Sequence, residues 1–144
     1  MSNISGLAEL FQNIEASKSA LEAEFSRAVR ATAQAIREDA IKSIAAHQSQ
    51  GREYTRGGVT HKASKAGHAP NQDRGTLTRN IRVTMNDDLT ADVTSNAPYS
   101  EALEFGTTNM QARPFMTPAS EGQRKKHKER LEKAAKNALS RGAK

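Results

Sequence analysis

The sequence predicts an α+β fold: a long N-terminal helix packs on a small antiparallel sheet, and a basic helix ends the chain. Apolar residues recur every three to four positions over residues 4–47, which is typical of a helix with one buried face. They alternate with polar residues between positions 77 and 94, as in half-buried strands, and helical spacing returns after residue 117. Packing the first helix on the sheet buries both apolar faces.

Length and composition indicate one small domain with a thin core. The chain has 144 residues, of which 35% are hydrophobic and 4% aromatic. We therefore expect residues 1–144 to form a single domain that gains stability from a partner or from its own copies. The absence of cysteine excludes disulfides and thiolate metal sites. No apolar run approaches the ~18 residues of a membrane span and no signal peptide follows Met1, so we expect a cytoplasmic protein without membrane contact.

The length of the N-terminal helix is the first open question. An unbroken helix over residues 4–47 would be ~65 Å long, whereas a compact domain of this size is only ~35–40 Å across. We therefore expect a break at Glu15–Ser19, because Lys18 falls on the apolar stripe and Ser17 can cap a new helix. If the helix is continuous, it projects beyond the body, and a neighbour has to bury the projecting stripe. The stripe consists of Ile4, Leu7, Phe11, Ile14, Leu21, Phe25, Ala28, Thr32, Ile36, Ala40 and Ile44.

Residues 48–75 have the composition of a loop. Five glycines stand among arginines, lysines and histidines without periodicity. Only Tyr54 and Val59 offer sizeable apolar burial, against a backbone entropy cost of roughly 1–2 kcal/mol per ordered residue. We therefore expect a flexible basic loop that becomes ordered on a partner, as a docking arm. A tolerated surface insertion is the alternative.

A β-hairpin follows this loop. Apolar and polar residues alternate from Leu77 to Met85 and from Leu89 to Thr94, and the Asn86-Asp87-Asp88 turn lies between the two runs. Two strands alone are marginally stable in water, so a third strand is needed. Residues Ala112–Thr117 are the best candidate for it, and a partner chain is another.

Two further helices complete the predicted fold. A short helix has Asn96 as its N-cap and Pro98 in its first turn, and it ends at Gly106, which can adopt a positive φ. The C-terminal helix has Thr117 as its N-cap and Pro118 at its first position, and it runs to about residue 141.

Two blocks of the sequence, within roughly residues 70–120, carry a family resemblance. The first runs from Asp73 to Arg82, where Gly75 leads into Leu77 and then Ile81. The second contains Tyr99, Glu104-Phe105-Gly106-Thr107, Met110, Ala112-Arg113-Pro114-Phe115-Met116 and Pro118-Ala119. In this order they resemble the small tail-component, or head–tail joining, proteins of lambdoid long-tailed phages. Arg74 departs from the threonine expected at its position.

The resemblance implies a structural protein of the virion, assembled in the host cytoplasm and located in the neck or tail. Such proteins are expected to act as a ring of several copies at the head–tail junction. The implied partners are other copies of the chain, the head-completion or connector protein, and the tail terminator or tail tube proteins, with packaged DNA close by. No cofactor and no membrane are implied.

The expected partner-binding residues follow from the resemblance and from the distribution of large side chains. Residues 96–119 hold two of the four phenylalanines and two of the four methionines of an aromatic-poor chain, which indicates specific packing. Phe105, Phe115 and Met116 are expected to anchor a neighbour, and Arg113 to bind a carboxylate with both arms of its guanidinium. The full set is Tyr99, Phe105, Met110, Arg113, Pro114, Phe115 and Met116, with Arg52 and Arg56 from the loop.

No catalytic or metal-binding constellation is recognisable in the sequence. A zinc site needs three or four converging ligands, and nothing accompanies the histidines His47, His61, His68 and His127. There is no Gly-x-Ser-x-Gly turn, and Gly57-Gly58 lacks the lysine of a phosphate loop. Glu101 and Glu104 are three apart on the short helix and are expected to be solvated. We therefore expect neither enzymatic activity nor a metal or cofactor.

The C-terminal helix supports a second hypothesis. Residues 121–144 carry nine Lys/Arg against three Glu, which is the whole net charge of +6, and residues 1–120 sum to zero. Cationic side chains such as Arg124, Lys125, Lys128 and Arg130 can neutralise nucleic-acid phosphates or dock on an acidic protein surface. The alternative to the structural role is therefore a small nucleic-acid-binding protein that acts through this helix. For the helix itself, a solvated terminal segment without a partner is a further interpretation.

Overall fold

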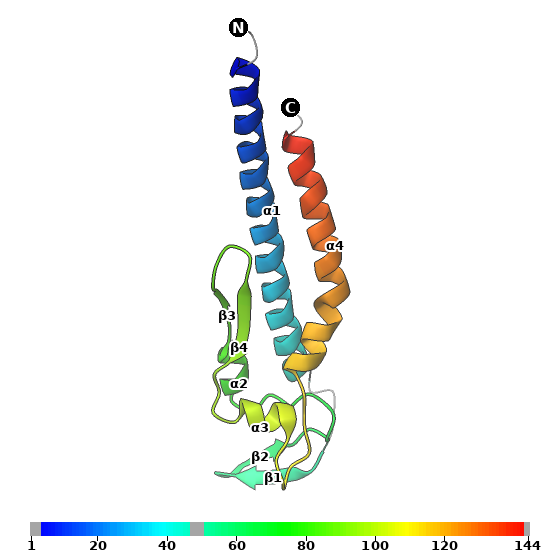
Figure 1. The fold of residues 1–144 in the computed structure, drawn as a ribbon. Coiled ribbons are helices and arrows are strands. Elements are labelled where there is room, and N and C mark those ends of the chain that lie inside the picture. Colours follow the sequence, from blue (N-terminus) through cyan, green and yellow to red (C-terminus); the bar gives the residue numbers. More distant parts are fainter. Residues whose placement is uncertain (1–3, 47–50, 143–144) are drawn as a thin grey trace.

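The computed structural model describes residues 4–46 and 51–142. Two long helices form a stem, the longer hairpin lies beside the C-terminal half of the first helix, and the short helices and the other hairpin lie around and beyond that helix's C-terminal end (Figure 1). In chain order the elements are α1 (Ile4–Ala45), β1 (Glu53–Arg56), β2 (Val59–Lys62), α2 (Thr76–Arg79), β3 (Ile81–Met85), β4 (Ala91–Ser95), α3 (Ser100–Phe105) and α4 (Met116–Gly142). The predicted α+β class, with a long first helix and a basic last one, is confirmed.

Helix α1 is continuous over 42 residues, so the predicted break at Glu15–Ser19 is wrong. Lys18 stays in solvent, where its Nζ lies 3.8 Å from a carboxylate oxygen of Glu15, and it does not interrupt the helix. No proline and no glycine after Gly6 disturbs the hydrogen-bond ladder. The helix is therefore ~63 Å long and projects beyond the end of α4 (Figure 1). The predicted end at residue 47 lies outside the described residues.

Small and polar side chains define the contact between α1 and α4. The buried alanines of these two helices outside the main core are Ala28, Ala33, Ala134 and Ala138. Thr32 Oγ1 lies 2.9 Å from His127 Nδ1, and Gln123 Nε2 donates a hydrogen bond to Asp39. These pairs show that the two helices are antiparallel. Within the described ranges, no helix offers an apolar stretch long enough to cross a membrane.

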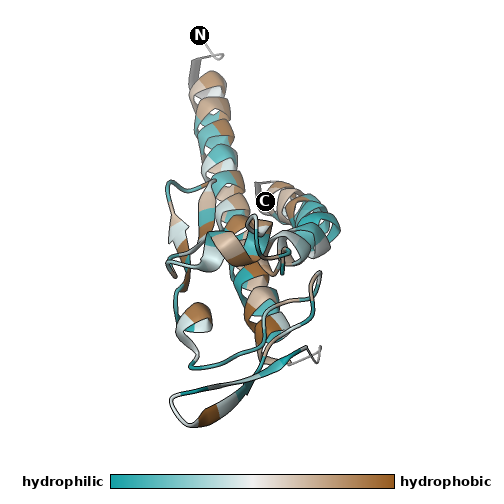
Figure 2. Cartoon of the chain, turned by 90° about the horizontal axis from the view of Figure 1, so that it is seen from below, coloured by the Kyte–Doolittle hydropathy of each residue, from teal (hydrophilic) through white to brown (hydrophobic). Residues whose placement is uncertain are grey.

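The main core lies where the C-terminal end of α1 meets the rest of the chain. It consists of Ala40, Ile44, Leu77, Ile81, Ala97, Phe115 and Ala119. Phe115, Ile44 and Ile81 are its largest fully buried side chains, so the core is as thin as the composition indicates. Arg37 Nε donates to the backbone oxygen of Ile81 at 2.9 Å and ties β3 to α1. Figure 2 shows that hydrophobic residues also recur along α1 away from this core.

The strands form two separate two-stranded antiparallel sheets. β3 pairs with β4, with Val83 opposite Val93, as the alternation predicts. The predicted third strand at Ala112–Thr117 is wrong. The N–H of Arg113 bonds the backbone oxygen of Leu103 at 2.6 Å, and α4 already begins at Met116.

The segment predicted as a flexible loop contains a second hairpin. β1 pairs with β2 in the register Glu53↔Lys62 to Arg56↔Val59. The turn between them is Gly57-Gly58, with φ of 61° and 79°, and two such residues are the preferred connection of a tight hairpin. The prediction of an irregular loop is therefore wrong for this part, whereas residues 48–50 lie outside the described ranges.

Two element boundaries differ from the sequence prediction. A turn of helix, α2, includes Leu77, where the first strand was expected to start, and β3 begins at Ile81. α3 begins at Ser100, so Asn96 is not its N-cap. The end of α3 is as predicted, because Gly106 follows it with φ of 78°.

Candidate partner-binding groove

A groove of about 850 Å³ opens at the base of the molecule, between the β1–β2 hairpin, the segment that leads into α2, and α3. Ile44 and Leu77 of the core contribute to its lining. Tyr54, Val59 and Tyr99 also line it and are 44%, 57% and 44% exposed. The groove therefore combines a concave shape with apolar side chains that no part of the described chain covers, as binding sites do.

The β1–β2 hairpin forms one wall and is held in place at several points. The N–H of Gly51 donates to the backbone oxygen of Ala63 at 2.8 Å. His61 Nδ1 lies 2.8 Å from a carboxylate oxygen of Asp73, and the ring of Tyr54 stacks on that of His61 at 5.4 Å between centroids. The His61–Asp73 contact joins the hairpin to the segment before α2, and the other two contacts hold the two sides of the hairpin together.

Helix α3 and the loop after it form the opposite wall. A Cβ at Gly106 would lie 2.7 Å from the backbone oxygen of Met110, and its φ is positive, so only glycine fits this turn. Thr107 and Met110 close the loop with two backbone hydrogen bonds of 2.7 and 3.2 Å. Gly67 then donates to the backbone oxygen of Ala112 at 2.8 Å, which ties the loop to the segment after β2.

Glu104 connects this wall to α4. Its side chain is 9% exposed, and its carboxylate accepts hydrogen bonds from the N–H groups of Phe115, Met116 and Thr117 at 2.9, 3.0 and 2.8 Å. The first N–H groups of a helix have no partner within the helix, so Glu104 caps α4 from α3. The prediction of Thr117 as N-cap is wrong, and so is that of a solvated pair of Glu101 and Glu104.

The pKa of Glu104 is lowered by this environment. Burial opposes ionisation, but hydrogen bonds from the Thr117 side chain and from the backbone N–H groups of Phe115, Met116 and Thr117 outweigh it. The positive end of the α4 dipole favours the same charge. Glu104 is therefore ionised at neutral pH, and its role is structural.

The groove is electropositive. Arg56, Lys62, Arg74 and Arg113 line it, against the single carboxylate of Asp73. Lys62 Nζ lies 3.5 Å from a carboxylate oxygen of Glu53, an exposed pair of little energetic weight. The remaining positive charge favours a ligand with carboxylates.

Three buried polar atoms of the groove lack a hydrogen-bond partner within the described residues: His61 Nε2, Ser64 Oγ and Arg113 Nε. Ser64 is 4% exposed and His61 is 13% exposed at its side chain. Buried polar atoms are nearly always hydrogen-bonded in folded proteins. In this conformation all three atoms are also shielded from solvent, so a ligand in the groove does not reach them.

The same residues do not form a catalytic triad. His61 pairs with Asp73 as in Ser-His-Asp sites, but Ser64 Oγ and His61 Nε2 do not hydrogen-bond to each other, so the serine–histidine contact of a triad is not formed. The burial of Ser64 also keeps a substrate from its hydroxyl. Across residues 4–46 and 51–142, no group of three His, Cys, Asp or Glu is placed to hold a metal ion.

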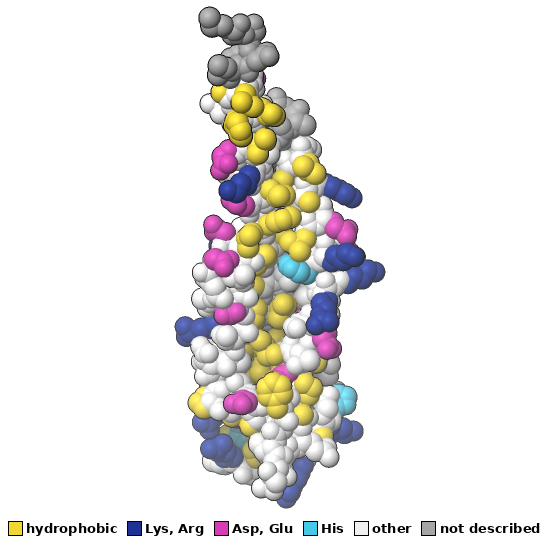
Figure 3. Space-filling model, in the orientation of Figure 1, with side chains coloured by type: hydrophobic (Ala, Val, Ile, Leu, Met, Phe, Trp, Pro, Cys, Tyr) yellow, Lys and Arg dark blue, Asp and Glu magenta, His cyan; other side chains and the backbone are white. Residues whose placement is uncertain are grey.

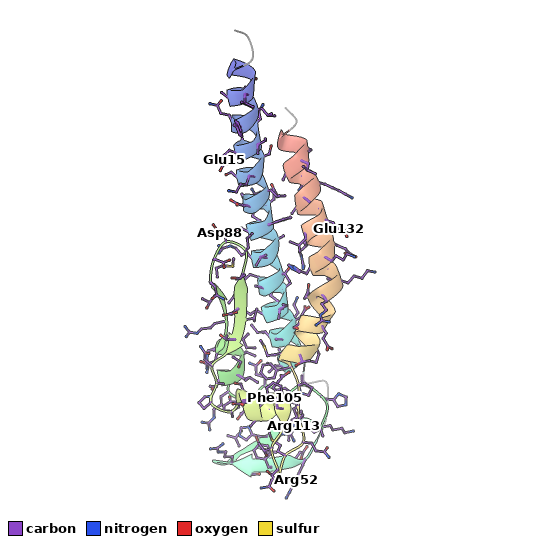
Figure 4. All side chains as sticks on the ribbon, in the orientation of Figure 1. Glu15, Arg52, Asp88, Phe105, Arg113 and Glu132 are labelled. Carbon is purple, nitrogen blue, oxygen red and sulfur yellow. The ribbon has the colours of Figure 1, made fainter. Side chains whose placement is uncertain are left out.

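Most of the predicted partner-binding residues lie at this end of the molecule. Arg56, Tyr99 and Arg113 line the groove. Figure 4 shows Phe105 and Arg113 near α3 and Arg52 at the hairpin. Phe105 is 75% exposed and so is accessible to a partner. The loop between α3 and α4 contributes the half-buried Met110 and Pro114.

Two of the predicted anchors point inward. Phe115 is 1% exposed at the centre of the core, and Met116 packs against that core. The expected role of Phe115 in holding a neighbour is therefore wrong for this conformation, whereas Met116 is half-buried and its role stays a prediction. Arg113 contacts the sulfur of Met110 at 3.7 Å, and in the described part of the chain no carboxylate pairs with it. The carboxylate partner predicted for Arg113 is therefore not supplied by the described residues, and this contact stays a prediction.

The groove also contains residues that the sequence analysis missed as a site. Val59 and Arg74 line it, with Tyr54 on the same hairpin. The signal was present in Gly57-Gly58, because a glycine pair between two short alternating runs favours a hairpin.

The basic helix α4 presents only part of its charge to solvent. Arg124, Lys125 and Lys128 are exposed, and Figure 3 shows Lys and Arg side chains along the outer side of α4. Arg130 instead turns toward α1, where its guanidinium donates to Thr32 Oγ1 at 3.2 Å and to Gln123 at 3.1 Å. Part of its guanidinium is thus used within the stem, and the predicted contact of Arg130 with a partner stays a prediction.

Comparison with known proteins identifies a family. Searches of curated proteins and of solved structures return no match. The family model described as "Bacteriophage HK97-gp10, putative tail-component" matches residues 8–106, from α1 to the end of α3. The match includes the block Asp73–Arg82 and ends before the Ala112–Met116 motif. Because it covers more than half of the chain, the chain belongs to this family of bacteriophage tail components.

Proposed function

We propose that this chain is a structural adaptor at the head–tail junction of its phage. In this role it is a neck or tail-completion subunit that forms a ring with its own copies and bridges the head connector and the tail. Membership in a family of phage tail components supports a structural role in the virion. The proposed partners are other copies, a head-completion or connector protein, and tail terminator or tail tube proteins.

The groove at the base is the observation on which the proposal rests. It exposes Tyr54, Val59 and Tyr99 beside a cationic lining. An acidic segment with one or two apolar side chains would complement both features. Phe105 lies on the adjoining helix and extends the apolar contact. We propose that this site binds another protein and that the chain has no enzymatic activity.

Phage particles assembled with altered protein test this proposal. We expect Arg56→Glu/Arg74→Glu, which reverses two exposed cations of the groove, to leave the protein folded but to accumulate unjoined heads and tails. The matched control is Lys125→Glu/Lys128→Glu on α4, which makes the same change of charge away from the groove. Cryo-EM of intact particles would locate the chain. A position at the tail tip, or normal joining with the groove variant, would contradict the proposal.

Nucleic-acid contact through α4 is the second candidate, favoured by the exposure of Arg124, Lys125 and Lys128. Such contact depends on salt, because each neutralised phosphate releases counterions. Lys125→Glu/Lys128→Glu should lower the affinity for duplex DNA and reduce the slope of log K against log salt by about 2. Fluorescence anisotropy at several salt concentrations measures this. Salt-independent binding, or none, would exclude this candidate.

A further inference from the structure

The N-terminal end of α1 carries an apolar surface that no part of the described chain covers. Leu7, Leu10, Phe11 and Ile14 are 52%, 53%, 63% and 54% exposed. Their spacing of three, one and three residues places them on one face of the helix. We call these four residues the tip stripe. Figure 3 shows hydrophobic side chains gathered at this end of α1.

The tip stripe continues the surface on which α4 packs. Leu21 and Ala28 follow Ile14 at intervals of seven residues, and both are at least half-buried on the stem. Since α1 is 42 residues long and α4 only 27, α1 extends past the end of α4 (Figure 1). The uncovered face is therefore a continuation of the α1 surface that contacts α4, beyond the point where α4 ends.

The end of α4 adds one more apolar residue to this surface. Leu139 is 70% exposed. It lies twelve residues after His127, which contacts Thr32, so it is level with Ala20 in the antiparallel pair. An additional helix laid along the tip stripe would thus meet the end of α4.

We propose that a second copy of this chain supplies that helix, with the two tips packed antiparallel about a two-fold axis. The spacing of the tip stripe is the same when it is read from either end. In an antiparallel pair, Leu7 therefore faces the partner's Ile14, and Leu10 faces the partner's Phe11. A two-fold interface requires such self-complementarity. The partner's tip then lies where α4 ends and continues its course along α1.

The charges around the tip stripe favour the antiparallel arrangement. Residues 4–17 contain Glu9 and Glu15 and neither lysine nor arginine. In the proposed register Glu9 lies level with the partner's Gln12, and Glu15 with the partner's Gly6. A parallel pair would instead bring each glutamate level with its own copy, and like charges repel.

The dimer is a weak one. A contact between two helix segments of about four turns is smaller than the ~1,600 Å² of a standard stable interface. Pairing therefore depends on concentration, and it leaves the two grooves at opposite ends of an elongated dimer. This interface is separate from the groove and does not depend on a location at the head–tail junction.

Cysteine pairing tests the register directly, because the chain contains no native cysteine. An equal mixture of Leu7→Cys and Ile14→Cys should form a disulfide-linked dimer on mild oxidation. Either variant alone should form at least ~10-fold less, because like positions lie ~10 Å apart along the antiparallel axis, beyond disulfide reach. Efficient pairing of each variant with itself would indicate parallel helices and overturn the proposal. Absence of any linked dimer would also overturn it.

Sedimentation equilibrium of the full chain supplies a second measurement. Leu10→Ser/Phe11→Ser should raise the dimer dissociation constant by at least ~30-fold, the effect of losing one interface hot spot of ~2 kcal/mol. Leu89→Ser is the matched control, since Leu89 is 47% exposed in the β3–β4 turn, and it should leave the constant unchanged. Arg56→Glu/Arg74→Glu should also dimerise normally. A monomeric wild type up to millimolar concentration, or loss of the dimer in the groove variant, would overturn the tip dimer.

Discussion

Apolar residues have the same spacing at the two ends of α1, but they are buried at the C-terminal end and exposed at the N-terminal end. At the C-terminal end, Ala40 and Ile44 are 0% and 1% exposed beneath α2, β3 and α4. At the N-terminal end, Leu10 and Ile14 remain more than half exposed. Helical periodicity therefore shows which face has to be buried, but not which molecule buries it. The elements that cover the C-terminal end of α1 come from residues after 75, and none of them reaches its N-terminal end.

The largest effect that this contrast predicts concerns two phenylalanines. Phe115→Ala should lower the free energy of unfolding by about 3–5 kcal/mol, because it leaves a cavity in a core with few large side chains. Phe105→Ala should change it by less than ~0.5 kcal/mol, because that ring is 75% exposed. Urea unfolding followed by circular dichroism measures both. Equal losses would mean that Phe105 is also a core residue in solution.

A pair of identical substitutions sharpens the comparison within α1. Ile44→Ala should cost about 2–5 kcal/mol of unfolding free energy, since Ile44 is fully buried in the core. Ile14→Ala should cost less than ~0.5 kcal/mol in solution dilute enough to dissociate the proposed dimer, since Ile14 is 54% exposed. At high concentration the second substitution should become more costly, because dimerisation stabilises the folded state. A constant effect of Ile14→Ala across concentrations would speak against the tip interface.

Features that depend on local sequence could be predicted. The stripe of α1, the β3–β4 hairpin and the stop at Gly106 each follow from residues a few positions apart. The prediction of a helix break around Lys18 was wrong because a long lysine side chain can lie along the helix surface with its charge in water. The β1–β2 hairpin was missed because its glycine pair stands in a segment whose composition resembles a loop.

Features that depend on long-range contact could not be predicted. Glu104 caps a helix that begins twelve residues later, at Met116, and nothing in its neighbourhood indicates that role. For the same reason Phe115 was assigned to a partner, although the chain folds back and buries it. The groove was half predicted: Tyr99, Arg56 and Arg113 were chosen from sequence, and the tertiary fold brings them together.

The next test concerns the C-terminal end of α1, where Glu104 caps the first turn of α4. Glu104→Ala should lower the free energy of unfolding by about 1–3 kcal/mol, because three backbone N–H groups lose their acceptor. Glu101→Ala is the matched control: this glutamate is one turn away and exposed, and its removal should be nearly neutral. Chemical denaturation of both variants gives the difference. If both cost the same, the cap does not form in solution.

The smallest expected effect is the pH dependence of the stability that the hydrogen bonds between Glu104 and α4 contribute. The folded-state pKa of Glu104 lies below its ordinary value of 4.5, although burial alone would raise it, because the hydrogen bonds from α4 favour the carboxylate. A depressed pKa means that the folded state holds this proton less tightly than the unfolded chain does. The resulting stability is fully present above pH 4.5 and is lost as the pH falls through the folded-state pKa.

Urea unfolding at several values between pH 6 and pH 3 should therefore show a decline in the wild type that is shallower in Glu104→Gln. Asp87 contributes a decline of the same sign, because hydrogen bonds from Thr90 and Leu89 lower its pKa. Asp87→Asn is thus needed as the reference background. An equal slope with and without the Glu104 carboxyl in that background would show that the α3–α4 contact contributes no pH-dependent stability, and the difference between the two ends of α1 would then rest on apolar packing alone.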